Sequence, residues 1–480
     1  MGCKIPMRYS IMAMVFFSTY INYCTRTNMS MSLPAMVKYK KKLIPECTKN
    51  EQTEPPPTDN STDSDEGSKT STQEDTGERY EWTESEQGAI LGAYFYGFMA
   101  GSLPAGAISE WFGPRWTIMV ATGVAGILNS VGVFITPLHW SALLVIRVLI
   151  GFTGALVYPA LQTLIGRWAP PQEKNKFTAC LMGNTLGTAL TWIIVGAVTS
   201  AWKWPWGFHV VSIECFLFLF VFFFLAWDSP EQCKWITDEE LEYIKTSQEG
   251  KVSKSKAVAP YCAMMKSIPF WALAILLFGN LWGLYLQINA GPKFMAEYIG
   301  FNIKSSGFMA SLPHLCRLFS GIFFGYMGDW LKRKKFKRVY ILKSFILTSH
   351  ILPGILMGMM ILAKCNKVIA IALLVFSMSI NGSAVVTHLA NPTDLAPNFA
   401  GSIFAAISFI GGTTGFINPA VTSALIDCYG NNTKAWGYVF MIGAIFYCGS
   451  GVLFIIFGSA DIQKWNEKKE PKPEEGPSGT

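Results

Sequence analysis

Twelve runs of mostly apolar residues, each about long enough to cross a bilayer as a helix, follow one another along the 480-residue chain. Several contain Gly or Pro, which membrane helices tolerate because neighbouring helices satisfy the freed backbone groups. Only 15% of the residues are charged, too few to cover the surfaces of soluble domains, where about 25% is usual. The pattern predicts an all-α membrane protein with twelve transmembrane helices, near residues 9–36, 85–108, 115–136, 141–166, 177–200, 206–227, 268–291, 305–328, 339–363, 367–390, 400–425 and 435–458.

Basic residues orient the predicted helices. Residues 331–338, "LKRKKFKR", contain six basic residues in eight and follow the eighth run. Because Lys and Arg are enriched in cytoplasmic loops, we expect this segment and both chain termini in the cytoplasm. The glycosylation sequons at Asn60 and Asn431 then fall on the outside, where we expect both to carry glycans.

The long loops divide the chain into two halves. We expect an N-terminal six-helix half at residues 1–227 and a C-terminal six-helix half at 268–458, joined by a cytoplasmic linker at 228–267. The linker segment "WITDEELEYI" predicts a short amphipathic helix along the membrane surface. The external loop 37–81, largely acidic and rich in Ser and Thr, and the tail 459–480 are predicted to be disordered.

Eleven cysteines are scattered along the chain without a C-x-x-C pair. Most lie in the apolar runs, where a buried thiol is the usual state. Cys47, Cys365 and Cys428 are expected to face the outside, and the sequence leaves open whether two of them form a disulfide. Nothing in the spacing supports a metal site, and we expect no resident cofactor and no nucleic-acid partner.

A short motif occurs twice, six runs apart. "GAISEW" follows the second run and "GYMGDW" follows the eighth, so both have the pattern Gly-x-x-x-acid-Trp with basic residues after it. The fifth and eleventh runs also share a Gly-x-x-x-Gly pattern, at Gly183/Gly187 and Gly411/Gly415. Each run therefore resembles the run six places later, a parallel six-plus-six repeat similar to that of the major facilitator transporters.

The repeated motif predicts a latch at the cytoplasmic helix ends. Glycine lets two helices approach closely, and the acidic and basic residues can form ion pairs that break as the halves move. The alternative is that these charges only set the topology, although topology does not need the acid. The predicted latch residues are Gly106, Glu110, Arg115, Gly325, Asp329, Lys332 and Arg333.

Two arginines are predicted inside the membrane, where a charge is costly and marks a functional position. Arg26 lies deep in the first run and Arg147 in the outer half of the fourth, two helices that face the central cavity in this arrangement. The guanidinium fork matches a carboxylate or a phosphate, so the pair predicts an anion site. Alternatively, each arginine caps backbone carbonyls or reaches outward to water.

Other polar residues in the runs are weaker candidates. Arg317 and His314 share a helix face in the eighth run and either add to a positive cavity or pack against a polar neighbour. Glu214 is the one acidic residue placed deep in a run, where a local hydrogen-bonding role is favoured over coupling. Asp394 is expected to be structural.

The chain resembles the anion–cation symporter family of the major facilitator superfamily over almost its whole length. The matching stretches include "RYSIMAMVFFSTYINYCTRTNMSMSLPAMV", "GAYFYGFMAGSLPAGAISEWFG" and "NPTDLAPNFAGSIFAAISFIGGTTGFINPA", and the segment "RWAPPQEK" is close to diagnostic. The resemblance implies that Arg26 and Arg147 contact the anion. It also implies that Tyr23, Asn28 and Tyr285 line the cavity.

The chain departs from the family at three positions. Proton-coupled members have Glu where this chain has Gly154. The vesicular glutamate group has His where this chain has Leu91, and Arg where this chain has Asn280. Asn280 then becomes a possible cavity residue. The missing carboxylate favours coupling to sodium, or transport driven by the membrane potential, with Glu214 as a possible substitute proton carrier.

The resulting hypothesis is a secondary transporter for inorganic phosphate or a small organic anion. The alternatives are a proton-coupled or voltage-driven transporter and a non-transporting sensor built on a transporter fold. An enzyme is disfavoured, because the sequence has no G-x-S-x-G, H-E-x-x-H or phosphate-binding loop. We expect the protein in the plasma membrane or in an endolysosomal or vesicular membrane.

Overall fold

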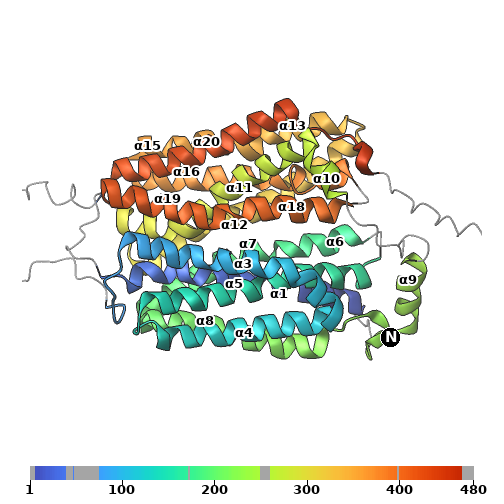
Figure 1. Ribbon diagram of the computed structural model, residues 1–480, viewed down its shortest axis with the longest axis horizontal. Helices are drawn as coiled ribbons and strands as arrows, with labels where there is room; N and C mark the ends of the chain where they lie inside the picture. The colour runs from blue at the N-terminus through green and yellow to red at the C-terminus, as the bar shows by residue number, and fades with distance from the viewer. Residues whose placement is uncertain are drawn as a thin grey trace, which may run out of the picture.

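The computed structural model shows twelve long helical segments where the apolar runs predict them, in two bundles that lie side by side (Figure 1). Among the residues that the structure describes, ten segments are long and apolar enough to cross a membrane by length and composition. The other two, α1 and α3, carry more polar and small residues. The structure describes residues 6–38, 47, 75–170, 173–248, 260–396 and 399–466.

The N-terminal bundle is built from the first six segments. They are α1 (Met7–Met36), α3 (Glu84–Phe112), α4 (Pro114–Ile135), α5 (Trp140–Trp168), α6 (Lys174–Ala179) continuing through η2 (Cys180–Met182) into α7 (Gly183–Trp202), and α8 (Trp204–Leu225). The linker that follows contains η3 (Pro230–Gln232), α9 (Asp238–Gln248) and α10 (Tyr261–Met265). The predicted linker helix is thus present as α9.

The C-terminal bundle contains more interrupted helices. Its elements are α11 (Ile268–Lys293) with the π-helical η4 (Phe294–Ile299), α12 (Ile303–Arg333), α13 (Arg338–Ile346), the π-helical η5 (Leu347–Ile351), α14 (Leu352–Gly358), α15 (Met360–Ala363), α16 (Lys367–Asn381), η6 (Gly382–Val386), α17 (Asn391–Leu395), α18 (Ala400–Gly412), α19 (Thr414–Tyr429), α20 (Thr433–Phe457) and η8 (Lys464–Asn466). Within the described residues no strand forms, and only an isolated bridge joins Val37 to Tyr80.

Local sequence signals fix several helix ends. Thr83 and Glu86 form a reciprocal capping box at the start of α3, in which each side chain accepts from the other's backbone N–H. Asn302 and Asn432 cap α12 and α20 in the simpler way, through their side-chain oxygens. Gly113, at φ 83°, lets the chain reverse between α3 and α4 in a conformation that favours glycine.

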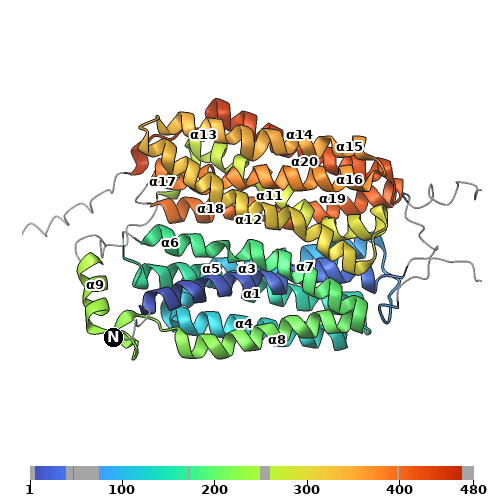
Figure 2. The same cartoon turned by 180° about the vertical axis from the view of Figure 1, so that it is seen from behind.

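The two bundles meet along α1, α3 and α7 on one side and α11, α12 and α19 on the other. Both views show α9 and the N-terminus at the same end of the molecule (Figure 1, Figure 2). We call this the terminal end, and the opposite end, which carries Tyr80 and Gly430, the loop end. The predicted orientation makes the terminal end cytoplasmic.

Helix α9 packs against the start of α1. The Glu240 carboxylate accepts hydrogen bonds from the backbone N–H groups of Met7 (2.9 Å) and Arg8 (3.0 Å), which have no partner inside α1. The Arg8 guanidinium lies 3.1 Å from the Glu173 carboxylate. The linker thereby stabilises the first turn of the helix that carries Arg26.

The disulfide left open by the sequence joins Cys47 to Cys365, across 318 residues of sequence. Cys428 is exposed and free. The bond connects the long loop of the N-terminal half to the turn between α15 and α16 in the C-terminal half.

Candidate anion-binding site

The Arg26 guanidinium lies among four aromatic rings contributed by both halves. Its carbon Cζ is 4.5 Å from the ring centre of Phe95 and 5.3 Å from that of Tyr94, both on α3. It is 4.9 Å from the ring of Tyr23 on α1 and 4.6 Å from that of Tyr285 on α11. These are cation–π distances. We call this arrangement the aromatic cage.

Two hydrogen-bond donors of Arg26 are unused. The side chain is only 6% exposed, and its Nε and Nη2 atoms are buried without a partner. None of the ion pairs among the described residues involves Arg26. A buried charge without a counter-charge is strongly unfavourable, so the cage has the positive electrostatics that an anion site requires.

Arg147 holds the backbone beside Arg26. Its Nη1 donates to the carbonyl oxygen of Thr25 (3.0 Å) and its Nη2 to that of Arg26 (2.8 Å). The side chain is 2% exposed, and only Nε lacks a partner. The guanidinium fork of Arg147 thus binds backbone carbonyls, which is the alternative to anion binding that the sequence left open, and it positions α1. A direct contact with the anion stays a prediction.

Asn28 is not brought to the cage. Its Nδ2 donates to Oδ1 of Asn129 on α4, at 2.8 Å, inside the N-terminal bundle. Two residues along a helix correspond to a rotation of about 200°, so Asn28 and Arg26 face opposite sides of α1. Tyr23 and Tyr285, in contrast, both contact the Arg26 guanidinium, and their role in lining a substrate cavity stays a prediction.

The Tyr94 hydroxyl occupies the space beside Gly154, the position at which the family's proton-coupled members have Glu. A Cβ atom at Gly154 would lie 2.4 Å from the Tyr94 hydroxyl oxygen, which is buried without a hydrogen-bond partner. Asn22 donates to the Gly154 carbonyl at 3.1 Å. The Tyr94 hydroxyl therefore takes the volume that a side chain at this position would need.

Gly154→Ala is expected to destabilise the protein, because the new methyl group collides with the Tyr94 hydroxyl. Overpacking of this kind typically costs about 1–3 kcal/mol. Thermal unfolding in detergent measures the loss. The double variant Gly154→Ala/Tyr94→Phe should recover most of it, and Gly166→Ala on the same helix, where nothing lies within 4 Å, is the control. A double variant no more stable than Gly154→Ala would contradict this packing.

The remaining cavity candidates lie outside the aromatic cage. Arg317 donates from Nε to Oδ1 of Asn381 at 3.0 Å. The His314 and Trp192 rings are nearly perpendicular, with 5.0 Å between ring centres. Asn280 is buried with Nδ2 unpartnered. Glu214 on α8 is half-buried, and its Oε2 has no hydrogen-bond partner.

The glycines of the predicted latch do not mediate close helix contacts in this structure. Nothing lies within 4 Å of a Cβ built at Gly106 or at Gly325, so close packing there is not present in this conformation and the latch stays a prediction. The Asp329 and Lys332 side chains are 3.5 Å apart on one exposed helix face. Arg115 donates to the carbonyl of Phe223. Arg333 is exposed, and the side chain of Glu110 lies outside the described part.

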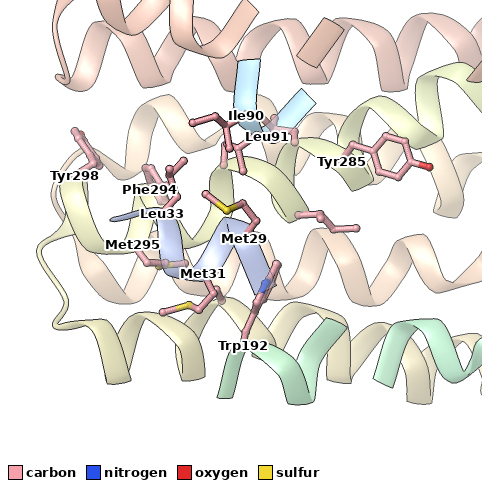
Figure 3. Packing of buried hydrophobic residues seen from close by; sticks show 14 of the residues in the cluster. Met29, Met31, Leu33, Ile90, Leu91, Trp192, Tyr285, Phe294, Met295 and Tyr298 are labelled. Carbon is pink, nitrogen blue, oxygen red and sulfur yellow. The ribbon is translucent and has the colours of Figure 1, made fainter. Parts of the chain in front are cut away.

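The close contacts between the halves occur instead toward the loop end. A Cβ at Gly415 would lie 1.9 Å from the Phe95 ring, and one at Gly307 would lie 2.3 Å from the Trp192 carbonyl oxygen. Buried apolar residues fill the space on this side of the cage, as Figure 3 shows with Tyr285 at one end and Tyr298 at the other. This apolar cluster includes Met29, Met31, Leu33, Ile90, Leu91, Trp192, Phe294 and Met295.

A buried lysine connects the halves at the loop end. Lys293 of α11, 4% exposed, forms an ion pair with Glu84 of α3 and donates to Oε1 of Gln87 at 2.6 Å. It also lies 3.7 Å from the Glu297 carboxylate one turn along its own helix. This loop-end ion pair and the apolar cluster close the loop end of the aromatic cage.

Of the two predicted glycosylation sites, Asn431 lies in the described part of the chain. Asn431 is half-buried: its Nδ2 donates to Glu297 (3.4 Å) and its Oδ1 accepts from the Trp436 indole (2.6 Å). Asn60 lies outside the described residues. Glycosylation of both stays a prediction.

Sequence reasoning did not single out Tyr94, Phe95 or Lys293. Tyr94 and Phe95 belong to the aromatic run "AYFYGF" at residues 93–98, and such a run does not distinguish rings that face lipid from rings that face a cation. Lys293 stands at a helix end, where a basic residue is usually read as a topology signal.

Two helical bundles around a buried cationic site, closed at one end by an ion pair between them, define a membrane transporter with two related halves. The family model described as Major Facilitator Superfamily matches residues 15–419. The chain is 27% identical to human sialin (Homo sapiens) over 472 residues, covering 95% of this chain and 90% of sialin. It is 26% identical to a putative inorganic phosphate cotransporter of Drosophila melanogaster over 487 residues, with 97% and 88% covered.

A solved structure shows the same fold. The crystal structure of a D-xylose-proton symporter superposes with a TM-score of 0.62 at 12% identity, over 92% of this chain and 97% of that one. The chain belongs to the Major Facilitator Superfamily, and its relatives are of the anion–cation symporter type, as the motifs indicated. It is therefore a transporter and not an enzyme.

Proposed function

We propose that this protein moves a small anion, either inorganic phosphate or a small organic anion, across a membrane by alternating access. The observation that carries the proposal is the pair of unused donors on the buried Arg26 guanidinium, inside a cage that both halves build. An anion bound there touches α1, α3 and α11 together. Its binding and release are thereby tied to the relative movement of the halves.

The surroundings of Arg26 favour an anion with an apolar body. A carboxylate or phosphate can accept from Nε and Nη2, while the rings of Phe95, Tyr23 and Tyr285 offer flat surfaces to the rest of the molecule. The names of relatives mention inorganic phosphate, urate and glutamate. These anions, with sialate, form the natural panel to test.

Because the loop end is closed in this conformation, an anion would reach the aromatic cage from the terminal end. Lys293, its partners and the apolar cluster separate the cage from the loop end. With the predicted topology, this is a state closed to the outside, in the plasma membrane or in an endolysosomal or vesicular membrane. Rocking of the halves would break the loop-end ion pair and bring the motifs of Gly106 and Gly325 together.

Sodium symport is the proposed mode of coupling. The position that holds Glu in proton-coupled members is Gly154, and the Tyr94 hydroxyl fills the space beside it. A sodium ion could be held by amide oxygens and by the carbonyls of interrupted helices. Glu214 would be the substitute carboxylate if a proton were used.

Uptake into proteoliposomes tests both parts of the proposal. Labelled phosphate, urate, glutamate and sialate are compared under inward sodium, inward proton and voltage gradients. At least one anion should accumulate with sodium, by at most about tenfold for each tenfold gradient of one coupled ion. Binding without uptake of any anion would favour the sensor alternative, and accumulation independent of sodium would refute sodium coupling.

A further inference from the structure

We propose that the turn between α12 and α13 binds the headgroup of a polyphosphoinositide, an anionic membrane lipid whose inositol ring carries phosphate monoesters. We call residues 330–340, which contain this turn, the basic turn. The aromatic cage contributes nothing to this surface, so the proposal does not depend on which anion the protein transports or on whether it transports one.

The basic turn lies at the terminal end of the C-terminal bundle. Helix α12 ends at Arg333 and α13 begins at Arg338. Both views place α13 toward the end that carries α9 (Figure 1, Figure 2). The predicted orientation makes this end cytoplasmic, and the anionic lipids of a cell membrane give its cytoplasmic leaflet a negative surface potential. The basic turn and the proposed lipid would therefore lie on the same side of the membrane.

A tight reversal of the backbone presents the basic side chains to water. The Lys334 N–H donates to the Trp330 carbonyl oxygen (3.1 Å) and the Lys335 N–H to the Lys332 carbonyl oxygen (3.0 Å), so α12 closes in a short turn. Lys335 has φ 61°, a left-handed conformation that is uncommon for a residue other than glycine. Every side chain of residues 332–337 is exposed, and all but Phe336 are basic. The reversal thus concentrates positive charge on a small surface.

The acidic residues near the basic turn neutralise only two of its charges. The Lys332 ammonium nitrogen lies 3.5 Å from the Asp329 carboxylate. Nε of Arg338 lies 2.8 Å from the Asp394 carboxylate. Within the described part of the chain, the other four basic residues of the turn form no ion pair: Arg333, Lys334, Lys335 and Lys337. These four exposed charges are available to a partner.

Orientation in the membrane does not require so many basic residues at this place. In the N-terminal half, the equivalent motif ends α3, the chain reverses at Gly113, and a single basic residue, Arg115, follows in α4. Arg115 donates to the carbonyl of Phe223 and is thereby engaged within its own bundle. Because the two halves are related, this turn is the internal reference for the basic turn. The additional, unpaired charges of the C-terminal half therefore indicate a function beyond topology.

Exposed aromatic side chains accompany these charges. Trp330, Phe336 and Tyr340 are 54%, 58% and 63% exposed. The Lys334 ammonium nitrogen lies 5.8 Å from the centre of the Trp330 ring. Trp and Tyr prefer the boundary between the headgroups and the hydrocarbon of a bilayer. Rings at this depth can contact the glycerol and the first acyl carbons of a lipid while the lysines reach its headgroup, so the surface fits a lipid better than a soluble anion.

Charge complementarity favours a headgroup with more than one phosphate. A phosphate monoester carries about −1.5 to −2 charges at neutral pH, so an inositol ring with two of them carries about −3 to −4. This charge matches the four unpaired basic residues, whose ammonium and guanidinium groups can donate charge-assisted hydrogen bonds to the phosphate oxygens. A phosphatidylserine headgroup carries only about one net negative charge, so several such lipids would have to gather at one short turn. The occupant that fits is a phosphatidylinositol bisphosphate.

Binding of a fluorescent, short-chain phosphatidylinositol bisphosphate to the purified full chain tests the proposal. The test variant replaces three exposed lysines of the basic turn: Lys334→Gln, Lys335→Gln and Lys337→Gln. The control replaces three exposed lysines at the loop end: Lys304→Gln, Lys364→Gln and Lys434→Gln. The control also matches the backbone, because Lys364, like Lys335, has a positive φ.

The two variants should differ strongly in affinity for the lipid. Each basic residue near an anionic lipid contributes roughly a factor of five, so the test variant should bind about 100-fold more weakly than wild type. The control should stay within about twofold of wild type, since its lysines lie at the other end of the molecule. Equal affinity of the two variants would overturn the proposal.

Two further ligands, measured on wild-type protein alone, define what the basic turn recognises. Phosphatidylserine of the same chain length should bind at least about tenfold more weakly, because it brings fewer charges. The inositol phosphate headgroup without acyl chains should also bind more weakly, because it loses the contact with the aromatic rings. Equal affinity for phosphatidylserine would refute a bisphosphate headgroup, and equal affinity for the free headgroup would refute a lipid. Wild-type protein that binds none of the three ligands refutes the inference regardless of how any variant folds.

Discussion

Arg26→Ala should reduce anion uptake by at least about 100-fold while leaving the amount of folded protein in the membrane unchanged. The variant removes two charge-assisted donors, each contributing about 1.5–3 kcal/mol, and every 1.4 kcal/mol corresponds to a factor of ten. Because these donors are buried and unpartnered without an anion, their loss should not lower the temperature of thermal unfolding. Uptake and unfolding are measured on the same preparations.

Arg26→Lys is the matched variant for this experiment. It keeps the positive charge but offers an ammonium instead of a planar fork, so it should recover only part of the uptake. Normal uptake by Arg26→Ala would remove Arg26 from the site. A large fall in unfolding temperature would show that the aromatic cage contributes stability rather than a place for an anion.

Lys293→Gln should open the loop end. The change leaves the Glu84 and Glu297 carboxylates without the ammonium group that lies between them. Breaking a buried ion pair by removing one partner costs about 3–5 kcal/mol. The cost falls on the conformation that buries the pair, so the equilibrium should move about 100-fold or more toward states in which the carboxylates reach water.

Thiol labelling from the loop end measures this shift. Leu91→Cys places a thiol in the apolar cluster, and Cys428→Ser removes the exposed native thiol on that side. A membrane-impermeant reagent should react much faster in Lys293→Gln than in the parent. Lys203→Gln is the control, because its pair with Asp75 is solvent-exposed and contributes little. Equal labelling rates in the two variants would contradict the gating role of Lys293.

The fold was predictable because its signals are local and strong. A run of about 20 apolar residues has one stable solution in lipid, a helix, so each segment could be placed from sequence alone. The interruptions at residues 347–351 and 382–386 were not predictable, because a π-helical or 3₁₀ turn depends on what the neighbouring helices offer to the freed backbone groups.

The site was predictable only in part. Arg26 was predictable because a charged residue inside a long apolar run is rare and easily recognised in the sequence. An aromatic residue such as Phe95 has the same sequence signature whether it faces lipid or a cation. The family resemblance placed Asn28 in the cavity with Arg26, but the helical rotation directs the two side chains to different sides of α1. The carbonyl partners of Arg147 belong to another helix, so only the three-dimensional structure could supply them.

The bond between Cys47 and Cys365 has a consequence for the cell biology of the protein. Disulfides form and persist in oxidising compartments, such as the endoplasmic reticulum lumen and the cell exterior, and are rare in the reducing cytosol. The disulfide therefore predicts that the loop end faces the luminal or extracellular side, and this prediction does not depend on the distribution of basic residues. A mobility shift between reduced and unreduced protein, both cleaved by protease between the two cysteines, would show that the bond is present.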